Sequence, residues 1–128
     1  MNIKLESQDI LKLSSSDING VILFGSQAQG LANQNSDLDI FILGKRSNTK
    51  YDLIYDIFSN KAGRLINIDI VFEDMATMEL MVHVARHGKV LYQKNINDFA
   101  NFKAKVMILA SDFDYHKQIY TKEIFNKI

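Results

Sequence analysis

Residues 21–24, Val-Ile-Leu-Phe, form a continuous apolar run that stops abruptly at Gly25-Ser26. A run this short, bounded by glycine, is typical of a central strand that is buried on both faces. A second run begins with Asp37-Leu38-Asp39 and becomes continuously apolar up to Leu43. The connection from Ser26 to Asp37 is short for a parallel crossover, so we expect these two strands to pair antiparallel.

The rest of the chain alternates between helical and strand patterns, which predicts an α/β (α+β) fold with a small mixed sheet flanked by helices. We expect one domain over residues 1–128, with a core at about 20–93 and a C-terminal helical segment at about 97–127. The pattern of that last segment predicts either one long helix or two short ones. The other expected elements are helices over 6–18, 49–62 and 75–87, a helical turn over 26–31, and strands over 65–72 and 89–93.

Composition excludes several classes of protein. The chain has no cysteine, which excludes disulfides and thiolate metal sites and favours a reducing, cytoplasmic setting. It has no signal-peptide pattern at its start and no apolar run near the roughly 20 residues that span a bilayer, so we expect no membrane partner. The formal net charge is zero, so direct nucleic-acid binding is not expected either.

Three aspartates occupy strand positions that charged residues normally avoid: Asp37, Asp39 and Asp69. Asp37 and Asp39 stand two residues apart, so on a strand they share a face, and burial would raise the pKa of at least one of them. Carboxylates in such places are paired or bind a metal ion. Without cysteine or clustered histidine, hard oxygen ligands select Mg²⁺ or Mn²⁺. Three carboxylates flanking two ions would make a two-metal site for phosphoryl transfer.

Gly25-Ser26 supplies the second half of such a site. A glycine at the end of a strand lets the backbone approach a phosphate closely. The amides at the start of the following helix, together with the Ser26 hydroxyl, would hold that phosphate. A phosphate cradle beside a carboxylate pair indicates a site for a nucleoside triphosphate.

This combination resembles a known family. Gly25-Ser26, then Asp37-Leu38-Asp39, then an isolated carboxylate at Asp69 on a third strand is similar to the polymerase β-type nucleotidyltransferase superfamily. The short chain and the segment Gly88-Lys89-Val90-Leu91-Tyr92 resemble its minimal members, the minimal nucleotidyltransferase (MNT) proteins. Many of these are antitoxins encoded beside HEPN-domain toxins.

The resemblance implies a role for each matching residue. Asp37, Asp39 and Asp69 would be the catalytic and metal-binding residues, and Gly25 and Ser26 would bind the β- and γ-phosphates. Two Mg²⁺ ions are implied, with Mn²⁺ as a substitute. The implied reaction transfers AMP from ATP to a tyrosine of a cognate HEPN toxin, releases pyrophosphate and silences the toxin's RNase.

The sequence departs from the family pattern at two places and leaves other functions open. Gln27 and Gln29 stand where many members have a basic residue, so the phosphates lose two positive charges. One alternative is a binding module that blocks its toxin by contact alone. Another is a nucleotidyltransferase that acts on a small molecule or an RNA end.

His83 and His87 stand four residues apart on an expected helix, as in half of a metal site. No glutamate follows His83 as the HExxH pattern requires, and His87 precedes Gly88, where a cation or donor caps a helix. The structural interpretation of this pair is therefore favoured.

Overall fold

The structure, a computed structural model, describes the backbone of residues 3–28, 37–62 and 67–126. It describes the side chains of the same residues except 26–27 and those beyond 112. The helices are α1 (Ser7–Ser14), α2 (Gly25–Ala28), α3 (Asn48–Ala62), the 3₁₀ turn η1 (Glu73–Met75), α4 (Met78–His87) and α5 (Asp98–Asn126). The strands are β1 (Gly20–Phe24), β2 (Leu38–Leu43), β3 (Ile68–Phe72) and β4 (Lys89–Gln93).

The strands form one mixed sheet in the order β3-β2-β1-β4. β1 runs antiparallel to both β2 and β4, and β2 runs parallel to β3. The expected antiparallel pairing of the first two strands is confirmed. The expected mixed sheet flanked by helices is also confirmed. β2 and β3 can run parallel because the connection between them contains α3 and is long enough for a crossover.

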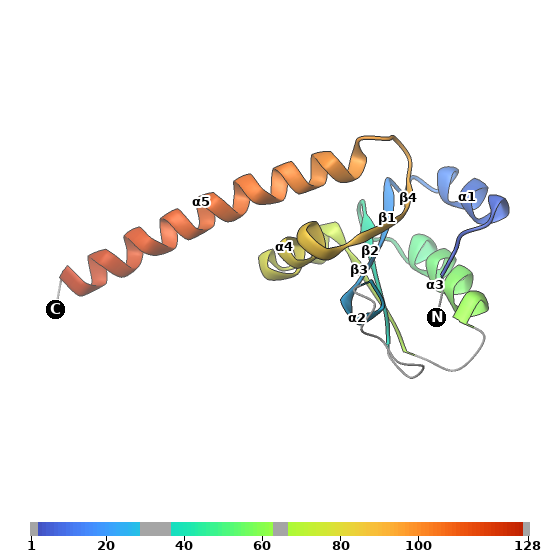
Figure 1. The fold of residues 1–128 in the computed structure, drawn as a ribbon, viewed down its shortest axis with the longest axis horizontal. Helices are drawn as coiled ribbons and strands as arrows, with labels where there is room; N and C mark the ends of the chain where they lie inside the picture. Colours follow the sequence, from blue (N-terminus) through green and yellow to red (C-terminus); the bar gives the residue numbers. More distant parts are fainter. Residues whose placement is uncertain (1–2, 29–36, 63–66, 127–128) are drawn as a thin grey trace.

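Helices cover both faces of the sheet (Figure 1). Side chains of α1 and α3 pack on one face, and side chains of α4 and α5 pack on the other. Alternate residues of β1 enter the two clusters, with Val21 and Leu23 on the α1/α3 face and Ile22 and Phe24 on the α4/α5 face. All five residues of β1 are buried, which explains why this strand is continuously apolar rather than alternating.

Two helices begin or end away from the expected residues. α1 ends at Ser14 instead of continuing to 18, because the Ser14 and Ser15 hydroxyls donate to the Leu11 carbonyl at 3.0 and 3.1 Å. Serine hydroxyls that bond to the backbone compete with helix continuation. α4 begins at Met78 instead of 75, because Thr77 caps it by accepting a hydrogen bond from the Leu80 N–H at 3.2 Å.

The C-terminal segment is one continuous helix, α5, of 29 residues. Its first part packs on the sheet through Phe102 and Val106, and the remainder extends away from the body of the molecule (Figure 1). Where the structure describes the chain, it contains no helix that combines the length and apolar character needed to cross a membrane.

Candidate active site

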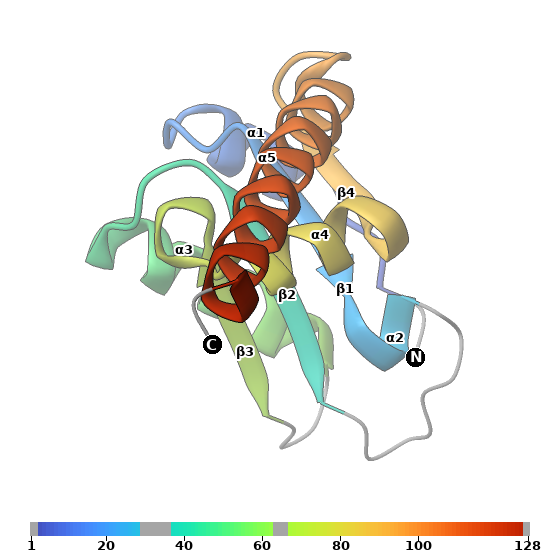
Figure 2. The ribbon, with the colours of Figure 1, turned by 90° about the vertical axis from the view of Figure 1, so that its left-hand side faces the viewer.

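The end of β1 meets the starts of β2 and β3 at one edge of the sheet. Phe24, the last residue of β1, pairs with Asp39, and Asp39 pairs in parallel register with Asp69. Figure 2 shows α2, which follows β1 directly, at the same end of the sheet as these strand starts. We call this region, residues 24–25, 37–39 and 68–69, the aspartate edge.

Asp39 is the most perturbed ionisable group of the aspartate edge. Its side chain is half-buried, and this burial is the main reason why the pKa of the carboxyl is raised to about 6. The negative charges of Asp69 and Asp37 raise that pKa further, as does a hydrogen bond with Asp69. The pKa of a carboxyl rises in this way when the charged form is poorly solvated and its neighbours are also anionic.

Asp37 and Asp69 flank Asp39 and are exposed to solvent. The Leu38 N–H donates to the Asn67 carbonyl at 2.9 Å, which ties the start of β2 to the residue before β3. No ion pair among the described residues involves any of the three aspartates, since those found join Lys50 to Asp17, Lys61 to Asp9 and Lys105 to Glu73. The aspartate edge is therefore a concentration of negative charge without a protein counter-ion in the described part of the chain.

Gly25 lies directly against the Asp39 carboxylate. Its φ is +74°, in the left-handed region that L side chains rarely adopt. A Cβ built at this position would collide with Oδ2 of Asp39 and come within 3.1 Å of Cγ. Glycine is needed here for both reasons.

The other predicted phosphate contacts are less completely described. Ser26 is the second residue of α2, so its backbone lies beside Gly25, but its side chain lies outside the described part of the structure. The Gln27 side chain and the whole of Gln29 also lie outside it. The structure thus brings together Gly25, Asp37, Asp39 and Asp69.

The donor set suits a hard divalent cation bound jointly with a substrate. Among the described residues, no group of three or more His, Cys, Asp or Glu side chains is arranged to hold one ion by itself. Mg²⁺, however, is usually held by one or two carboxylates plus substrate phosphates and water. The paired carboxylates of Asp39 and Asp69 meet that requirement, and a cation would offset both the burial of the Asp39 charge and its repulsion by Asp69 and Asp37.

The raised pKa of Asp39 predicts an unusual pH dependence of stability in chelator. Between pH values of about 4 and about 6 the folded chain keeps a proton on Asp39 that the unfolded chain has released. The free energy of unfolding should therefore fall as pH rises through this window and level off above it. The shift corresponds to about 3 kcal/mol at most, and partial exposure of the carboxyl reduces the expected effect to about 1 kcal/mol. Urea denaturation at pH 4.5 and pH 7 measures it, and an Asp39→Asn variant with the same pH dependence would contradict the assignment.

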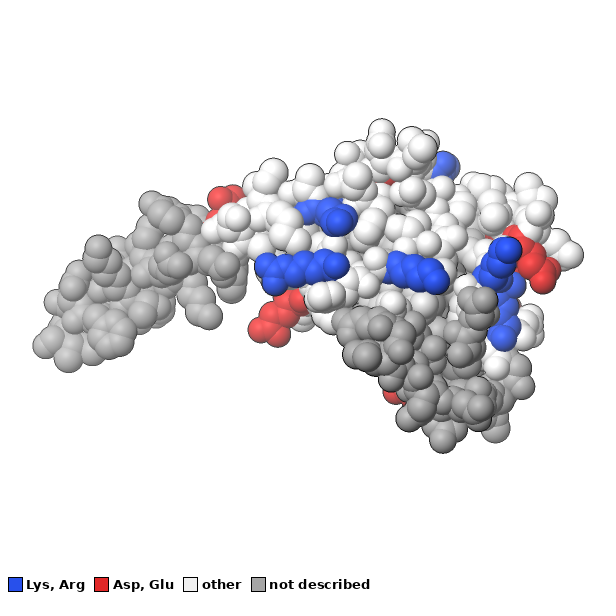
Figure 3. All heavy atoms as spheres, in the orientation of Figure 1, with Lys and Arg blue, Asp and Glu red and all other residues white. Residues whose placement is uncertain are grey.

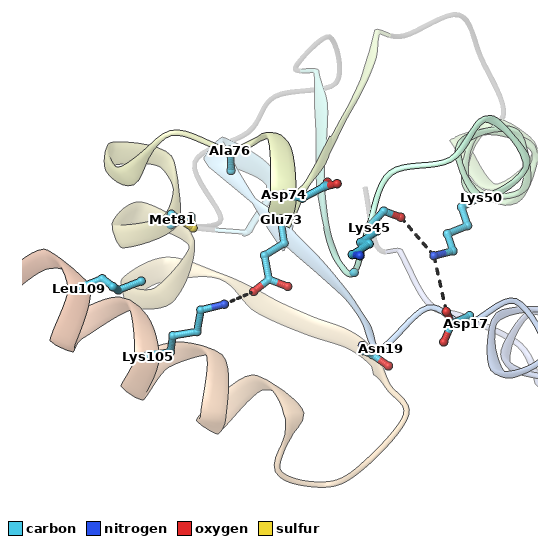
Figure 4. Close-up of a pocket in the computed structure, with 11 residues that line it drawn as sticks. Asp17, Asn19, Lys45, Lys50, Glu73, Asp74, Ala76, Met81, Lys105 and Leu109 are labelled. Carbon is cyan, nitrogen blue, oxygen red and sulfur yellow. Dashed lines mark hydrogen bonds and ion pairs between the residues drawn. The ribbon is translucent and has the colours of Figure 1, made fainter.

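A hollow of about 720 Å³ lies at the opposite end of the sheet (Figure 4). Its three carboxylates all have partners: Glu73 pairs with Lys105 at 3.3 Å, Asp17 with Lys50 at 4.0 Å, and Asp74 accepts hydrogen bonds from the Arg46 backbone N–H. Despite its volume, this hollow lacks the unpaired carboxylates that mark the aspartate edge.

His83 and His87 lie on the same face of the sheet as the aspartates. The His83 ring contacts the Phe24 ring edge to face, with centroids 6.3 Å apart, and the two histidine rings are 5.2 Å apart. Sequence reasoning singled out their spacing but assigned them a structural role. Only the packing of α4 on β1, which joins distant parts of the chain, shows how near they come to the aspartate edge.

A family model described as "Polymerase beta, Nucleotidyltransferase" matches residues 6–97. The protein adenylyltransferase MntA of Aphanizomenon flos-aquae (strain 2012/KM1/D3) is 32% identical over 106 residues. That alignment takes in 69% of this chain and 65% of the relative, so the chain spans just under two thirds of the relative's length.

Two solved structures have the same fold. One is described as a toxin-antitoxin with AMP-PNP, with a TM-score of 0.69, 24% identity, and coverage of 94% of this chain and 99% of that one. The other is a tri-AMPylated Shewanella oneidensis HEPN toxin in complex with MNT antitoxin, with a TM-score of 0.63, 21% identity, and coverage of 92% and 94%. The family match includes every residue of the aspartate edge and most of the chain, and the protein therefore belongs to the polymerase β-type nucleotidyltransferase family.

Proposed function

We propose that this chain is a Mg²⁺-dependent protein adenylyltransferase, acting in the cytoplasm as the antitoxin of a toxin–antitoxin pair. It would transfer AMP from ATP to a tyrosine hydroxyl of a HEPN-domain toxin. The observation that carries this proposal is the aspartate edge, where three carboxylates meet a glycine turn within the matched family region. The similarity to MntA and to toxin–antitoxin structures supports the choice of nucleotide and partner.

Asp37, Asp39 and Asp69 are the residues that would hold the metal ions. When bound, Mg²⁺ neutralises the triphosphate and stabilises the charge that develops during phosphoryl transfer. The carboxylates of Asp39 and Asp69 lie on adjacent strands at the same register position, which suits two ligands of a shared ion. The half-burial of Asp39 limits the access of water to the carboxyl at the centre of the set.

Gly25 and Ser26 would hold the β- and γ-phosphates, because the Gly25 backbone lies directly against the Asp39 carboxylate and Ser26 follows it at the start of α2. Asp69 would help to orient and deprotonate the acceptor hydroxyl. The tyrosine oxygen forms a bond to the α-phosphorus, the bond from that phosphorus to the bridging oxygen breaks, and pyrophosphate leaves with the electron pair. The products are an AMP–tyrosine ester and pyrophosphate.

A protein acceptor fits the shape of the chain. The far part of α5 projects from the body, and Ile108 and Leu109 at its base are 64% and 39% exposed. A large protein partner would cover such exposed apolar residues. An RNA end is less suited, because the formal net charge of the chain is zero and the face drawn in Figure 3 carries acidic as well as basic side chains among uncharged ones.

A second candidate function is neutralisation of the toxin by contact alone. Gln27 and Gln29 favour it, because both replace basic residues that would attract the triphosphate. Under this alternative the carboxylates would be a remnant of the ancestral site, and nucleotide transfer would be dispensable.

The position of a radioactive label tests the proposed reaction. The chain and a HEPN-domain partner encoded beside it are incubated with Mg²⁺ and ATP labelled at either the α- or the γ-phosphate. We expect label on the partner from α-labelled ATP and none from γ-labelled ATP, because pyrophosphate leaves. Label from the γ-position would indicate a kinase-type reaction, and no label from either would favour neutralisation by contact.

A further inference from the structure

We propose that His83 and His87 bind the β- and γ-phosphates of the nucleotide, in a chain whose Gln27 and Gln29 carry no positive charge. This inference deepens the proposed function and depends on it. Both histidines belong to α4, which contains neither the Gly-Ser motif nor any of the three aspartates.

The C-terminal end of α4 lies near the aspartate edge. The helix ends at His87, and β4 begins two residues later at Lys89. Lys89 pairs with Leu23, the residue before Phe24 on β1. The last turns of α4 are therefore anchored beside the end of β1, where Gly25 and the phosphate-binding turn follow.

The histidines occupy the flank of α4 that faces this edge. Gly88 packs over Ile22, since a Cβ built on Gly88 would lie 2.6 Å from Cγ2 of Ile22. His83 packs instead against Phe24, which lies two residues further toward the aspartate edge. His87 is one turn further along the same flank, with its ring 5.2 Å from that of His83.

Phe24 connects this flank to the carboxylates. It pairs with Asp39 across the sheet, so both side chains point to the α4/α5 face, and it immediately precedes Gly25 in the chain. A triphosphate held by Gly25 and by cations on Asp39 would lie beside Phe24, within reach of the adjacent His83 ring. His83 is half-buried and His87 is exposed, so the first is held in place and the second can adjust to the ligand.

A triphosphate bound at the aspartate edge needs hydrogen-bond donors from the protein. Three carboxylates surround the edge, and no described basic side chain forms an ion pair with them. Imidazole N–H groups donate hydrogen bonds to phosphate oxygens. Two imidazoles on one helix flank would complement a pyrophosphate group, which carries more negative charge than the α-phosphate alone.

Substitutions at His83 separate phosphate binding from packing. His83→Phe keeps an aromatic ring against Phe24 and removes the N–H donors, whereas His83→Gln keeps an N–H donor. Binding is measured by calorimetry with Mg²⁺ and two probes, AMP and the α,β-methylene analogue of ATP, which cannot release pyrophosphate. His116→Gln replaces the remaining histidine and serves as the control.

We expect His83→Phe to weaken binding of the ATP analogue about tenfold, as for loss of a hydrogen bond to a charged group, and to leave AMP binding within about twofold. His83→Gln should retain most of the affinity for the analogue, His87→Gln should lose less than His83→Phe, and His116→Gln should match the wild type. Equal weakening of both probes would overturn the inference, because the ring would then contact adenosine or only support the fold.

Unchanged binding of the ATP analogue by His83→Phe would also overturn this inference and leave the proposed function standing. Failure of the wild-type chain to bind the ATP analogue would overturn the proposed function together with the inference. The two failures are thus distinguished by the wild-type titration alone.

Discussion

An Asp39→Asn variant should lose AMP transfer almost completely and yet be more stable than the wild type in chelator above pH 6. The loss follows because the substitution removes the central ligand of the proposed metal site. Metal ions contribute several kcal/mol to transition-state stabilisation, which corresponds to a rate loss of roughly 10³-fold. The gain in stability follows because asparagine removes the charge whose burial and neighbours raise the pKa of Asp39.

Two measurements on this variant test both halves of the prediction: the initial rate of label transfer, and the urea midpoint at pH 7 in chelator. Asp17→Asn is the matched control, because Asp17 lies at the other end of the sheet with its side chain 87% exposed. It should change neither rate nor midpoint appreciably. An Asp39→Asn variant that transfers AMP at the wild-type rate would exclude the aspartate edge as the active site.

A Gly25→Ala variant should keep the fold but lose most of its activity. The added Cβ would collide with the Asp39 carboxylate and would occupy a φ of +74°. The strained backbone should lower the free energy of unfolding by about 1–2 kcal/mol. The displaced carboxylate should slow transfer by about 10²-fold, because catalytic geometry tolerates little displacement.

Gly44→Ala separates these two effects of the Gly25 substitution. Gly44 also has a positive φ, +140°, but a Cβ there would meet no atom closer than the Asp17 carbonyl oxygen at 3.8 Å. We expect a loss of stability without a comparable loss of transfer rate. If both alanine variants transferred AMP equally well, the close contact between Gly25 and Asp39 would not be needed for transfer, and the prediction would be wrong.

Much of the fold could be predicted from local patterns. The apolar run of β1 and the short connection after it correctly predict a central strand paired antiparallel to β2. β4 occupies the expected residues 89–93. The limits of α1 and α4 were less predictable, because single hydroxyl contacts decide them: Ser15 on the Leu11 carbonyl, and Thr77 on the Leu80 N–H.

The residues of the aspartate edge could be singled out from the sequence, but their arrangement in space could not. The aspartates and Gly25 stand out because charge and glycine are unusual beside buried strands. The pairing of Asp39 with Asp69 depends on a parallel register between segments separated by α3, which no local pattern specifies. The position of His83 against Phe24 likewise depends on the packing of α4 on β1, so periodicity alone indicated only a helix face.

The most direct test of the central claim is the intact mass of the partner. A HEPN-domain protein encoded beside this chain is purified after co-expression with the wild type or with Asp39→Asn, and both preparations are weighed by mass spectrometry. We expect a gain of one AMP unit, or a multiple, only with the wild type. An unmodified partner that still forms a stable, inactive complex with the wild type would contradict it and establish neutralisation by contact.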